Sequence, residues 1–381
     1  MLSSNFVLET ADGLKLPLRR FSPAGRRPQS AVLMLHGASA NSDTFLTPHG
    51  GIVAHLLERG TEVWLLDWRG SSRVVEDYGP EHAPLFTFER VAEHDLGAAL
   101  AQIRRVSSCR QLSVFGHCIG ATCVAMALAR GWLARFDVEQ CVLTTIGLFF
   151  SASVDGFLKA EDGILERVGA EDPACTGIDP RHGSDWPEQL RRAYEAWPAC
   201  LLPAGDTQAD DVYRRASFMF GAPYRRALVA DDVHARVGNL FGRMHLGLFL
   251  QAGQCLRRGF AAAFDAAELG PGAEAARSVY LDPTWFERTR VTLLTGKSNQ
   301  LWHRESVDKM YEWLRNETRA EHRKHVLPKY GHQDLLWGRD AARDVYPLIE
   351  AGLIARQSAA SPLAASRAVE ARQSQHARLA G

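Results

Sequence analysis

The apolar positions of the chain form two kinds of pattern, which alternate along its first 150 residues. The segment from Asn5 to Phe21 alternates apolar and polar residues around Asp12-Gly13, which predicts a β-hairpin. A continuous apolar run at 31–35 predicts a parallel strand covered on both faces, and mainly apolar runs at 62–67, 112–115 and 141–146 predict further strands. Helix-like stretches separate these runs at about 51–59, 88–106 and 121–129. This alternation predicts a mostly parallel central sheet with helices on both faces.

The alternation stops near Phe150, and no convincing strand follows until about residue 286. Helical stretches with Trp-Pro punctuation fill this segment, for example at 237–257. We expect a helical cap over 151–285, which roofs a site built by two parts of an α/β core, 1–150 and 286–355. A second domain without a role in binding is the alternative. The later core predicts strands at 291–295 and 325–327, helices at 305–316 and 339–354, and a disordered tail over 356–381.

The turn between the third buried run and its helix is Gly116-His117-Cys118-Ile119-Gly120. A strand, a turn with small residues on both sides of a nucleophile, and a helix together form a nucleophile elbow. Glycine is expected at both flanking positions because the turn is tight. Most elbows carry serine, but this one carries cysteine. We therefore predict an acyl-transfer enzyme that uses the thiolate of Cys118. The alternative is a cysteine that only packs in the core, and we assign that role to the other six.

Cys118 needs a base and a group that orients the base. His332, on the loop after the last predicted strand, is the predicted base. Asn299, after the preceding strand, occupies the position where serine enzymes usually have aspartate. Because a thiol can be ionised as a thiolate–imidazolium pair, a neutral amide can suffice to hold the ring, as in Cys-His-Asn proteases. In the alternative, Asn299 is only a turn residue, and Asp334 or another carboxylate supports His332.

The oxyanion hole is predicted from two backbone N–H groups. The first belongs to Ile119, which follows the nucleophile at a helix N-terminus, where the helix dipole also favours a thiolate. The second belongs to Ala38, which follows His36-Gly37 at the end of the first parallel strand.

These motifs resemble the α/β-hydrolase superfamily, in its acid-lipase-like branch. The nearest resemblance is to bacterial hydrolase-like domains that are fused to, or encoded beside, glucose-methanol-choline (cholesterol-oxidase-like) flavin oxidoreductases. The matching stretches are HGASANS at 36–42, VWLLDWR at 63–69, GHCIG at 116–120, FMFG at 218–221, YGHQD at 330–334 and AARDVYP at 341–347. The resemblance implies a capped hydrolase of lipid-like esters, with Cys118, His332, Ala38 and Ile119 in the roles given above. Acid lipases have Ser at the elbow and Asp in place of Asn299, so their activity does not transfer directly.

A weaker, local resemblance relates Gly116 to Leu128 to polyhydroxyalkanoate synthases, which also use a cysteine elbow. It implies acyl transfer from a thioester. The leading expectation is cleavage of a thioester or ester through a Cys118 acyl-enzyme. An acyltransferase with a non-water acceptor and a non-catalytic ligand-binding relative are the alternatives. We expect a small-molecule acyl substrate, with CoA-bound and carrier-bound donors among the candidates.

The composition limits the classes of partner and ligand that we expect. Lys+Arg and Asp+Glu both number 44 and the pI is near 7.2, which argues against a nucleic-acid or anionic-membrane surface. Seven cysteines without C-x-x-C spacing indicate neither a disulfide framework nor a zinc site. No apolar run approaches the ~18 residues that span a bilayer, and no signal peptide is recognised. We expect a cytoplasmic protein without metal or cofactor, and a homodimer is one candidate for its oligomeric state.

Overall fold

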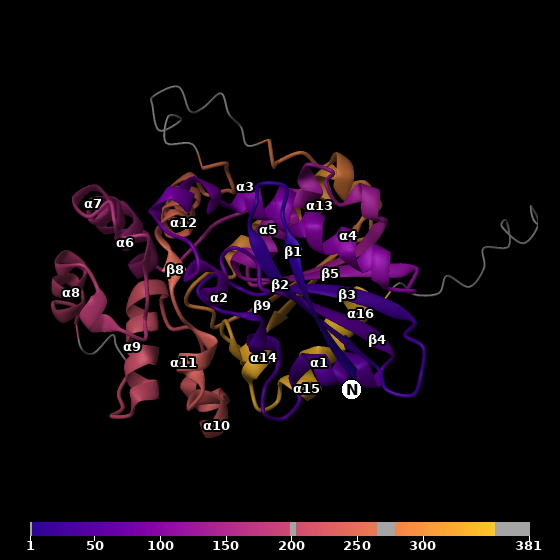
Figure 1. Ribbon diagram of the computed structural model, residues 1–381, viewed down its shortest axis with the longest axis horizontal. Helices are drawn as coiled ribbons and strands as arrows, with labels where there is room; N and C mark the ends of the chain where they lie inside the picture. The colour runs from indigo at the N-terminus through magenta and orange to yellow at the C-terminus, as the bar shows by residue number, and fades with distance from the viewer. Residues whose placement is uncertain (1, 199–202, 265–278, 355–381) are drawn as a thin grey trace, which may run out of the picture.

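An eight-stranded sheet runs through the middle of the molecule (Figure 1). The computed structural model describes residues 2–198, 203–264 and 279–354. Strand β1 pairs antiparallel with β2, and β2 with β4, whereas the other pairs are parallel. The predicted hairpin and mostly parallel sheet are therefore confirmed. In spatial order the strands are β1 (Leu2–Glu9), β2 (Lys15–Ser22), β4 (Thr61–Leu66), β3 (Ser30–Leu35), β5 (Gln111–His117), β6 (Val138–Thr144), β9 (Arg290–Gly296) and β10 (Arg323–Leu327).

Helices cover both faces of the sheet because successive strand residues point to opposite sides. In β3, Leu33 and Leu35 belong to one hydrophobic cluster, whereas Val32 and Met34 belong to a second one on the other face. The first cluster includes residues of α4 (Leu96–Val106), α5 (Ile119–Ala129) and α13 (Glu305–Glu317). The second includes residues of α1 (Gly51–Glu58) and α16 (Tyr346–Leu353). The continuous apolar runs are thus buried on both sides, as predicted.

Three predicted helices differ from the structure. The helix expected over 88–106 consists of α3 (Phe88–Arg90), a π-helical segment (Val91–Asp95) and α4. The helix expected over 339–354 is divided into α15 (Ala341–Asp344) and α16, where Pro347 occupies the first turn and has no N–H to continue a helix from the preceding residues.

The prediction of a single helix over 237–257 is wrong. The chain instead forms α11 (Val237–Leu240), the short strand β8 (Met244–His245) and α12 (Leu246–Arg258). Strand β8 pairs with β7 (Gly177–Ile178), so the segment also contains two short strands that were not expected. The helix is interrupted where Gly242 exchanges hydrogen bonds with the loop after β3.

The helices of the predicted cap lie together beside the sheet, at the left of Figure 1. They are α6 (Val154–Asp162), α7 (Ile164–Glu171), α8 (Glu188–Glu195), α9 (Gln208–Phe220), α10 (Asp231–His234) and α11. We use the name cap for these helices together with α12. The predicted tail, 356–381, and Cys200 lie outside the described residues.

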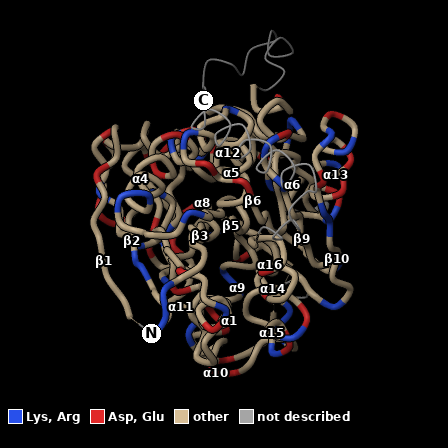
Figure 2. Tube along the Cα trace, turned by 90° about the vertical axis from the view of Figure 1, so that its right-hand side faces the viewer, with Lys and Arg blue, Asp and Glu red and all other residues tan. Residues whose placement is uncertain are grey.

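Charged residues of both signs are interspersed around the periphery (Figure 2), as the equal numbers of acidic and basic residues suggest. Within the described residues, no helix combines the length and the apolar character needed to cross a membrane.

One buried ion cluster ties three distant segments together. Arg69, which is fully buried after β4, donates through Nη2 to Asp95 of the π-helical segment at 2.5 Å. Through Nη1 it donates at 2.9 Å to Asp12, in the turn of the β1–β2 hairpin. The guanidinium therefore joins the β1–β2 hairpin and the π-helical segment to the residues that follow β4.

We predict that Arg69→Met lowers the free energy of unfolding by about 3–5 kcal/mol, because it leaves the buried carboxylate of Asp95 without a cation. Arg192→Met, which removes an exposed helical pair with Glu188, is the matched control and should cost about 0–1 kcal/mol. Urea unfolding of both variants checks this. Equal losses would contradict the assigned role of the buried cluster.

Candidate active site

The candidate residues lie at the carboxyl edge of the parallel strands. Cys118 follows β5, Ala38 follows β3, Asn299 follows β9 and His332 follows β10. Carboxyl ends of parallel strands meet at one edge of a sheet, where ligand sites of this architecture form. Cys118, Ile119, Ala38 and His332 all line one cavity, whereas Asn299 lies beside it and does not.

The elbow places Cys118 in a strained conformation, with φ of 56° and ψ of −133°. A non-glycine residue seldom adopts a positive φ. The flanking glycines are sterically required: an added Cβ would lie 2.6 Å from the Ala121 Cα at Gly116, and 2.4 Å from the His36 carbonyl oxygen at Gly120. The close packing of β5, α5 and the loop after β3 therefore fixes the nucleophile.

The Cys118 thiol is nearly buried, with 8% of the residue exposed. The indole Nε1–H of Trp302 donates a hydrogen bond to Sγ at 3.4 Å. Burial raises the pKa of Cys118 to about 11, although hydrogen bonds from Trp302 and from the Ile119 N–H partly oppose the rise. The resting group is therefore a neutral thiol.

His332 is also buried, and its ring centroid lies 4.8 Å from that of His117. Burial, together with the neighbouring His117, lowers the pKa of His332 well below 6.5. The ring is therefore a neutral imidazole that can accept a proton. No hydrogen bond joins Cys118 to His332 among the described residues, and such catalytic bonds often tighten only with substrate present. Burial thus favours the neutral forms of both groups, thiol and imidazole, in the absence of substrate.

Asn299 is placed near the site but does not hydrogen-bond the His332 ring. Its Oδ1 accepts from the backbone N–H groups of Leu301 at 3.1 Å and Trp302 at 3.3 Å. Its buried Nδ2 and the Nδ1 of His332 both lack partners within the described chain. Asn299 thus stabilises the turn that carries Trp302.

Asp334 closes the loop that carries His332. Its Oδ2 accepts from the Gly331 N–H at 2.8 Å, while Oδ1 has no partner among the described atoms. Burial raises the pKa of Asp334, and the Gly331 hydrogen bond opposes the rise. Asp334 therefore contacts the backbone beside His332 and not the ring.

The loop after β3 carries Ala38 and is hydrogen-bonded to Gly242, which lies between α11 and β8. The next residue is Ser39, whose Oγ donates to the Gly242 carbonyl at 2.6 Å. The Ser39 carbonyl in turn accepts from the Gly242 N–H at 2.8 Å. Ile119, the first residue of α5, directs its N–H toward the Cys118 sulfur. The two proposed oxyanion donors thus come from α5 and from a loop attached to the cap.

Two residues of the site were not predicted from the sequence, Trp302 and Asp67. Buried Asp67 accepts from Ser42 and Ser71 and lies 3.5 Å from His36, at the base of the loop after β3. Although burial opposes it, the neighbouring His36 and the hydrogen bond from Ser42 hold the pKa of Asp67 below its usual range. The strand-end position of Asp67 was the signal in the sequence. Trp302 was signalled only by its place three residues after Asn299.

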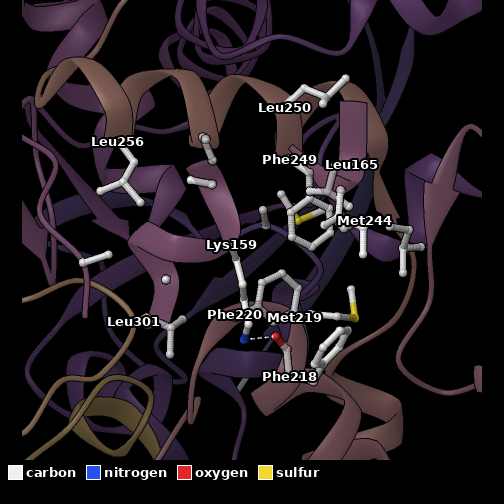
Figure 3. A pocket seen from close by; sticks show the side chains of 18 of the residues that line it. Lys159, Leu165, Phe218, Met219, Phe220, Met244, Phe249, Leu250, Leu256 and Leu301 are labelled. Atoms are coloured by element: carbon white, nitrogen blue, oxygen red, sulfur yellow. Dashed lines mark hydrogen bonds between the residues drawn. The ribbon is translucent and has the colours of Figure 1, made fainter. Parts of the chain in front are cut away.

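The cavity has a volume of about 370 Å³ and extends from Cys118 into the cap. Figure 3 shows apolar side chains from several cap elements turned toward it. Lys159 reaches the same region, where its ammonium group donates to the Phe218 carbonyl and lies 4.2 Å from the Trp197 ring centroid. The described residues include no group of three His, Cys, Asp or Glu side chains arranged to hold a metal. Because most of the lining side chains are apolar, the cavity is suited to an apolar ligand.

Comparisons with known proteins agree with this arrangement. Residues 30–146 match the model of the alpha/beta hydrolase fold, and a solved lipase in its open form shares the architecture with a TM-score of 0.61. This chain has the α/β-hydrolase fold. The lipase match covers 92% of this chain and 98% of the lipase at 15% identity.

The curated relatives of this α/β-hydrolase-fold chain are acid-lipase-like. A "Tear acid lipase-like protein" of Mesocricetus auratus is 26% identical over 175 residues, which cover 43% of this chain and 42% of that protein. The human "Lysosomal acid lipase/cholesteryl ester hydrolase" is 27% identical over 137 residues, 32% and 33% of the two chains. This chain thus spans less than half the length of these relatives. The predicted α/β-hydrolase fold is confirmed, and these relatives agree with a hydrolase enzyme.

We predict that Gly37→Ala lowers kcat/KM on a p-nitrophenyl ester about 10- to 100-fold. The added Cβ would lie 2.8 Å from the Cys118 Cβ and 3.3 Å from Sγ, so the loop or the nucleophile must move. Gly238→Ala is the control, since its Cβ meets only Val212 at 3.8 Å. An unchanged kcat/KM for Gly37→Ala, with both variants folded, would contradict the assigned geometry.

Proposed function

We propose that this chain is an acyl-transfer enzyme that cleaves a thioester or ester of a lipid-like acyl substrate through an acyl-enzyme on Cys118. The observation that carries the proposal is the thiol at a strained elbow, open to an apolar cavity that a neutral histidine also lines. A nucleophile, a base and two backbone N–H groups at one cavity wall are the parts that acyl transfer requires.

In the first step His332 removes the thiol proton while Sγ of Cys118 attacks the acyl carbonyl carbon. The N–H groups of Ala38 and Ile119 stabilise the negative charge that develops on the carbonyl oxygen. The tetrahedral intermediate expels the leaving group, which takes the proton from His332. In the second step His332 removes a proton from water or another acceptor, which attacks the thioester carbonyl. The Cys118 thiolate leaves and recovers its proton from the imidazolium.

The cavity supports an acyl chain as the bound group. Its labelled lining in Figure 3 is almost entirely apolar, with Leu165, Met244 and Phe249 among its side chains. Burying apolar surface is favourable by roughly 0.8 kcal/mol per CH₂ group, so longer chains should bind more tightly until the cavity is filled. The relatives, an acid lipase-like protein and a lysosomal acid lipase/cholesteryl ester hydrolase, support a lipid-like substrate.

The cysteine favours an activated acyl donor. An acyl group that moves from a thioester to Cys118 exchanges one thioester bond for another, whereas an oxygen ester must give up a more basic leaving group. The local resemblance to polyhydroxyalkanoate synthases supports the same preference, and CoA-bound or carrier-bound donors are therefore the first to test. The resemblance to hydrolase-like domains beside glucose-methanol-choline oxidoreductases adds support for a lipid-like substrate.

Replacing Cys118 by Ala should lower turnover of the best thioester or p-nitrophenyl ester by at least about 10³-fold, because the covalent step is lost. Cys123→Ala, on the same helix but fully buried in the core, is the matched control and should retain turnover. Steady-state kinetics of the purified variants check this. Unimpaired Cys118→Ala would end the proposal and favour a ligand-binding role.

Product analysis with CoA, alcohol and amine acceptors separates hydrolysis from transfer. Free acid as the sole product identifies a hydrolase, and acylated acceptor identifies a transferase.

The pH dependence should reflect a neutral resting pair. The pKa of His332 lies well below 6.5, and that of Cys118 is about 11. Because the imidazole must be unprotonated to act, kcat/KM should stay level down to pH 6.5 and fall only below it. A thiolate–imidazolium pair would instead lose activity with rising pH, as the imidazolium loses its proton. A pH profile with a decline between pH 6.5 and 9 would contradict the neutral pair.

A further inference from the structure

The indole of Trp302 contacts the reacting atom of the site directly, through the 3.4 Å hydrogen bond from Nε1 to the Cys118 Sγ. We propose that Trp302 is a catalytic residue that stabilises the Cys118 thiolate, and that Asn299 is a positioning residue that acts on Cys118 through Trp302 and not through His332. This inference rests on the proposed function, since it concerns the same nucleophile.

The chemistry of the contact favours the ionised sulfur. An indole N–H is a donor only, so the sulfur must be the acceptor. A thiol is a weak acceptor, and hydrogen bonds to an ionised partner are roughly twice as strong. The bond therefore strengthens as the thiol loses its proton, which is the differential stabilisation that catalysis needs. The same N–H meets the sulfur again when the thiolate leaves the acyl-enzyme.

Trp302 is fixed from three directions. The backbone N–H of Trp302 donates to Oδ1 of Asn299, and its backbone also forms a β-bridge with Ala152 at the start of the cap. Its ring packs edge-on against Phe150, with centroids 5.2 Å apart. These contacts fix the direction of the indole N–H before any substrate binds.

The orientation of the Asn299 amide excludes the role that was expected from its position. The amide oxygen is used by two backbone N–H groups, so only Nδ2 remains, and Nδ2 can only donate. A neutral His332 that accepts a proton at Nε2 carries its own proton on Nδ1, which then needs an acceptor. Asn299 cannot supply one in this orientation. Its hydrogen bonds instead connect it to Trp302.

The first test measures the rate at which iodoacetamide alkylates Cys118, followed by mass mapping of its peptide at about pH 8, well below the thiol pKa. Losing a hydrogen bond to a charged group should raise that pKa by about one to two units. A thiolate of higher pKa is also more nucleophilic, which offsets part of the loss. Trp302→Phe should therefore react about 3- to 10-fold more slowly.

Trp197→Phe is the matched control, because this variant also removes an indole that lines the cavity, but one without a hydrogen bond to the sulfur. Its alkylation rate should match or exceed that of wild type, because the smaller side chain can only ease access. Easier access past the smaller phenylalanine would raise the rate, so a fall in Trp302→Phe cannot come from access. An unchanged or faster rate in Trp302→Phe overturns the proposal.

A double-mutant cycle tests the route from Asn299. Asn299→Ala should slow alkylation, while Asn299→Ala/Trp302→Phe should react no more slowly than Trp302→Phe alone. The effect of Asn299→Ala should persist in a His332→Ala background, and Asn299→Ser, which keeps an acceptor oxygen for the turn, should restore part of the rate. Additive losses with Trp302→Phe, or an effect that vanishes without His332, would overturn the positioning role.

A spectroscopic measurement remains decisive if Trp302→Phe does not fold. In protein labelled with ¹⁵N-tryptophan, alkylation of Cys118 should shift one indole N–H signal strongly, and Cys118→Ala should shift the same signal. No shifted indole signal would overturn the proposal. These readouts use no substrate. Failure here with a Cys118 acyl-enzyme still observed would leave the proposed function standing, whereas confirmation here without an acyl-enzyme would count against the proposed function alone.

Discussion

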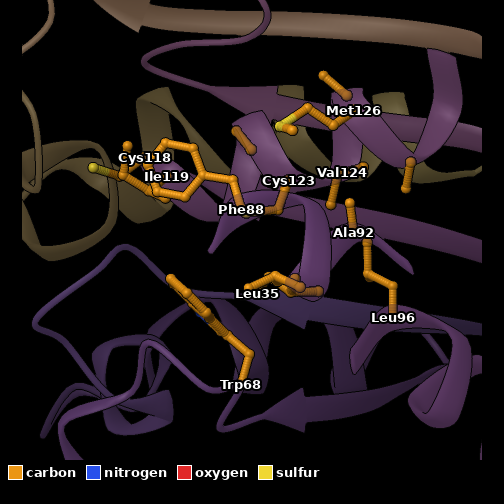
Figure 4. Close-up of a cluster of buried hydrophobic side chains, with 14 of the residues drawn as sticks. Leu35, Trp68, Phe88, Ala92, Leu96, Cys118, Ile119, Cys123, Val124 and Met126 are labelled. Atoms are coloured by element: carbon orange, nitrogen blue, oxygen red, sulfur yellow. The ribbon is translucent and has the colours of Figure 1, made fainter. Parts of the chain in front are cut away.

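The site depends on one steric constraint, which is the close packing of the β5–α5 turn against the loop after β3. Holding Cys118 at a φ of 56° costs on the order of 1–3 kcal/mol, and the surrounding structure must supply that energy. The hydrophobic cluster drawn in Figure 4 lies beside the turn, and the Cys118 sulfur points away from it. The same packing brings Gly37 close to the sulfur, which sets the position of the predicted oxyanion loop.

Burial decides the electrostatics of the site. It lowers the pKa of His332 and raises the pKa of Cys118, which favours the neutral form of both groups without substrate. In the proposed mechanism, negative charge develops on the sulfur and the carbonyl oxygen only during the reaction, close to N–H groups that are already in place. In the proposed mechanism the N–H groups of Ala38 and Ile119 stabilise the carbonyl oxygen, and the Trp302 indole, which already donates to the sulfur, stabilises the thiolate.

Much of the fold could be predicted from the sequence because periodicity reports burial directly. The runs at 31–35 and 112–115 are buried on both faces, and Gly116 and Gly120 identified the elbow through sterics alone. The helix expected over 237–257 was wrong because its interruption depends on partners elsewhere in the chain, at Ser39 and in β7. Long-range pairing of this kind leaves no local pattern.

The candidate site was predictable to the level of positions and not to the level of hydrogen bonds. Strand order alone placed Cys118, His332 and Asn299 at one edge of the sheet. The direction of the Asn299 amide is set by the N–H groups of the turn that follows it, which sequence spacing does not describe. For the same reason the sequence did not reveal that Trp302 reaches the nucleophile.

Intact-mass analysis after reaction with activated acyl donors tests the central claim most directly. Acyl thioesters and p-nitrophenyl esters would be offered to wild type and to His332→Ala, followed by peptide mapping. The account predicts a mass increase of one acyl group on Cys118, which clears slowly in His332→Ala because deacylation lacks its base. Turnover of these donors without an adduct, or an adduct on another residue, would contradict it.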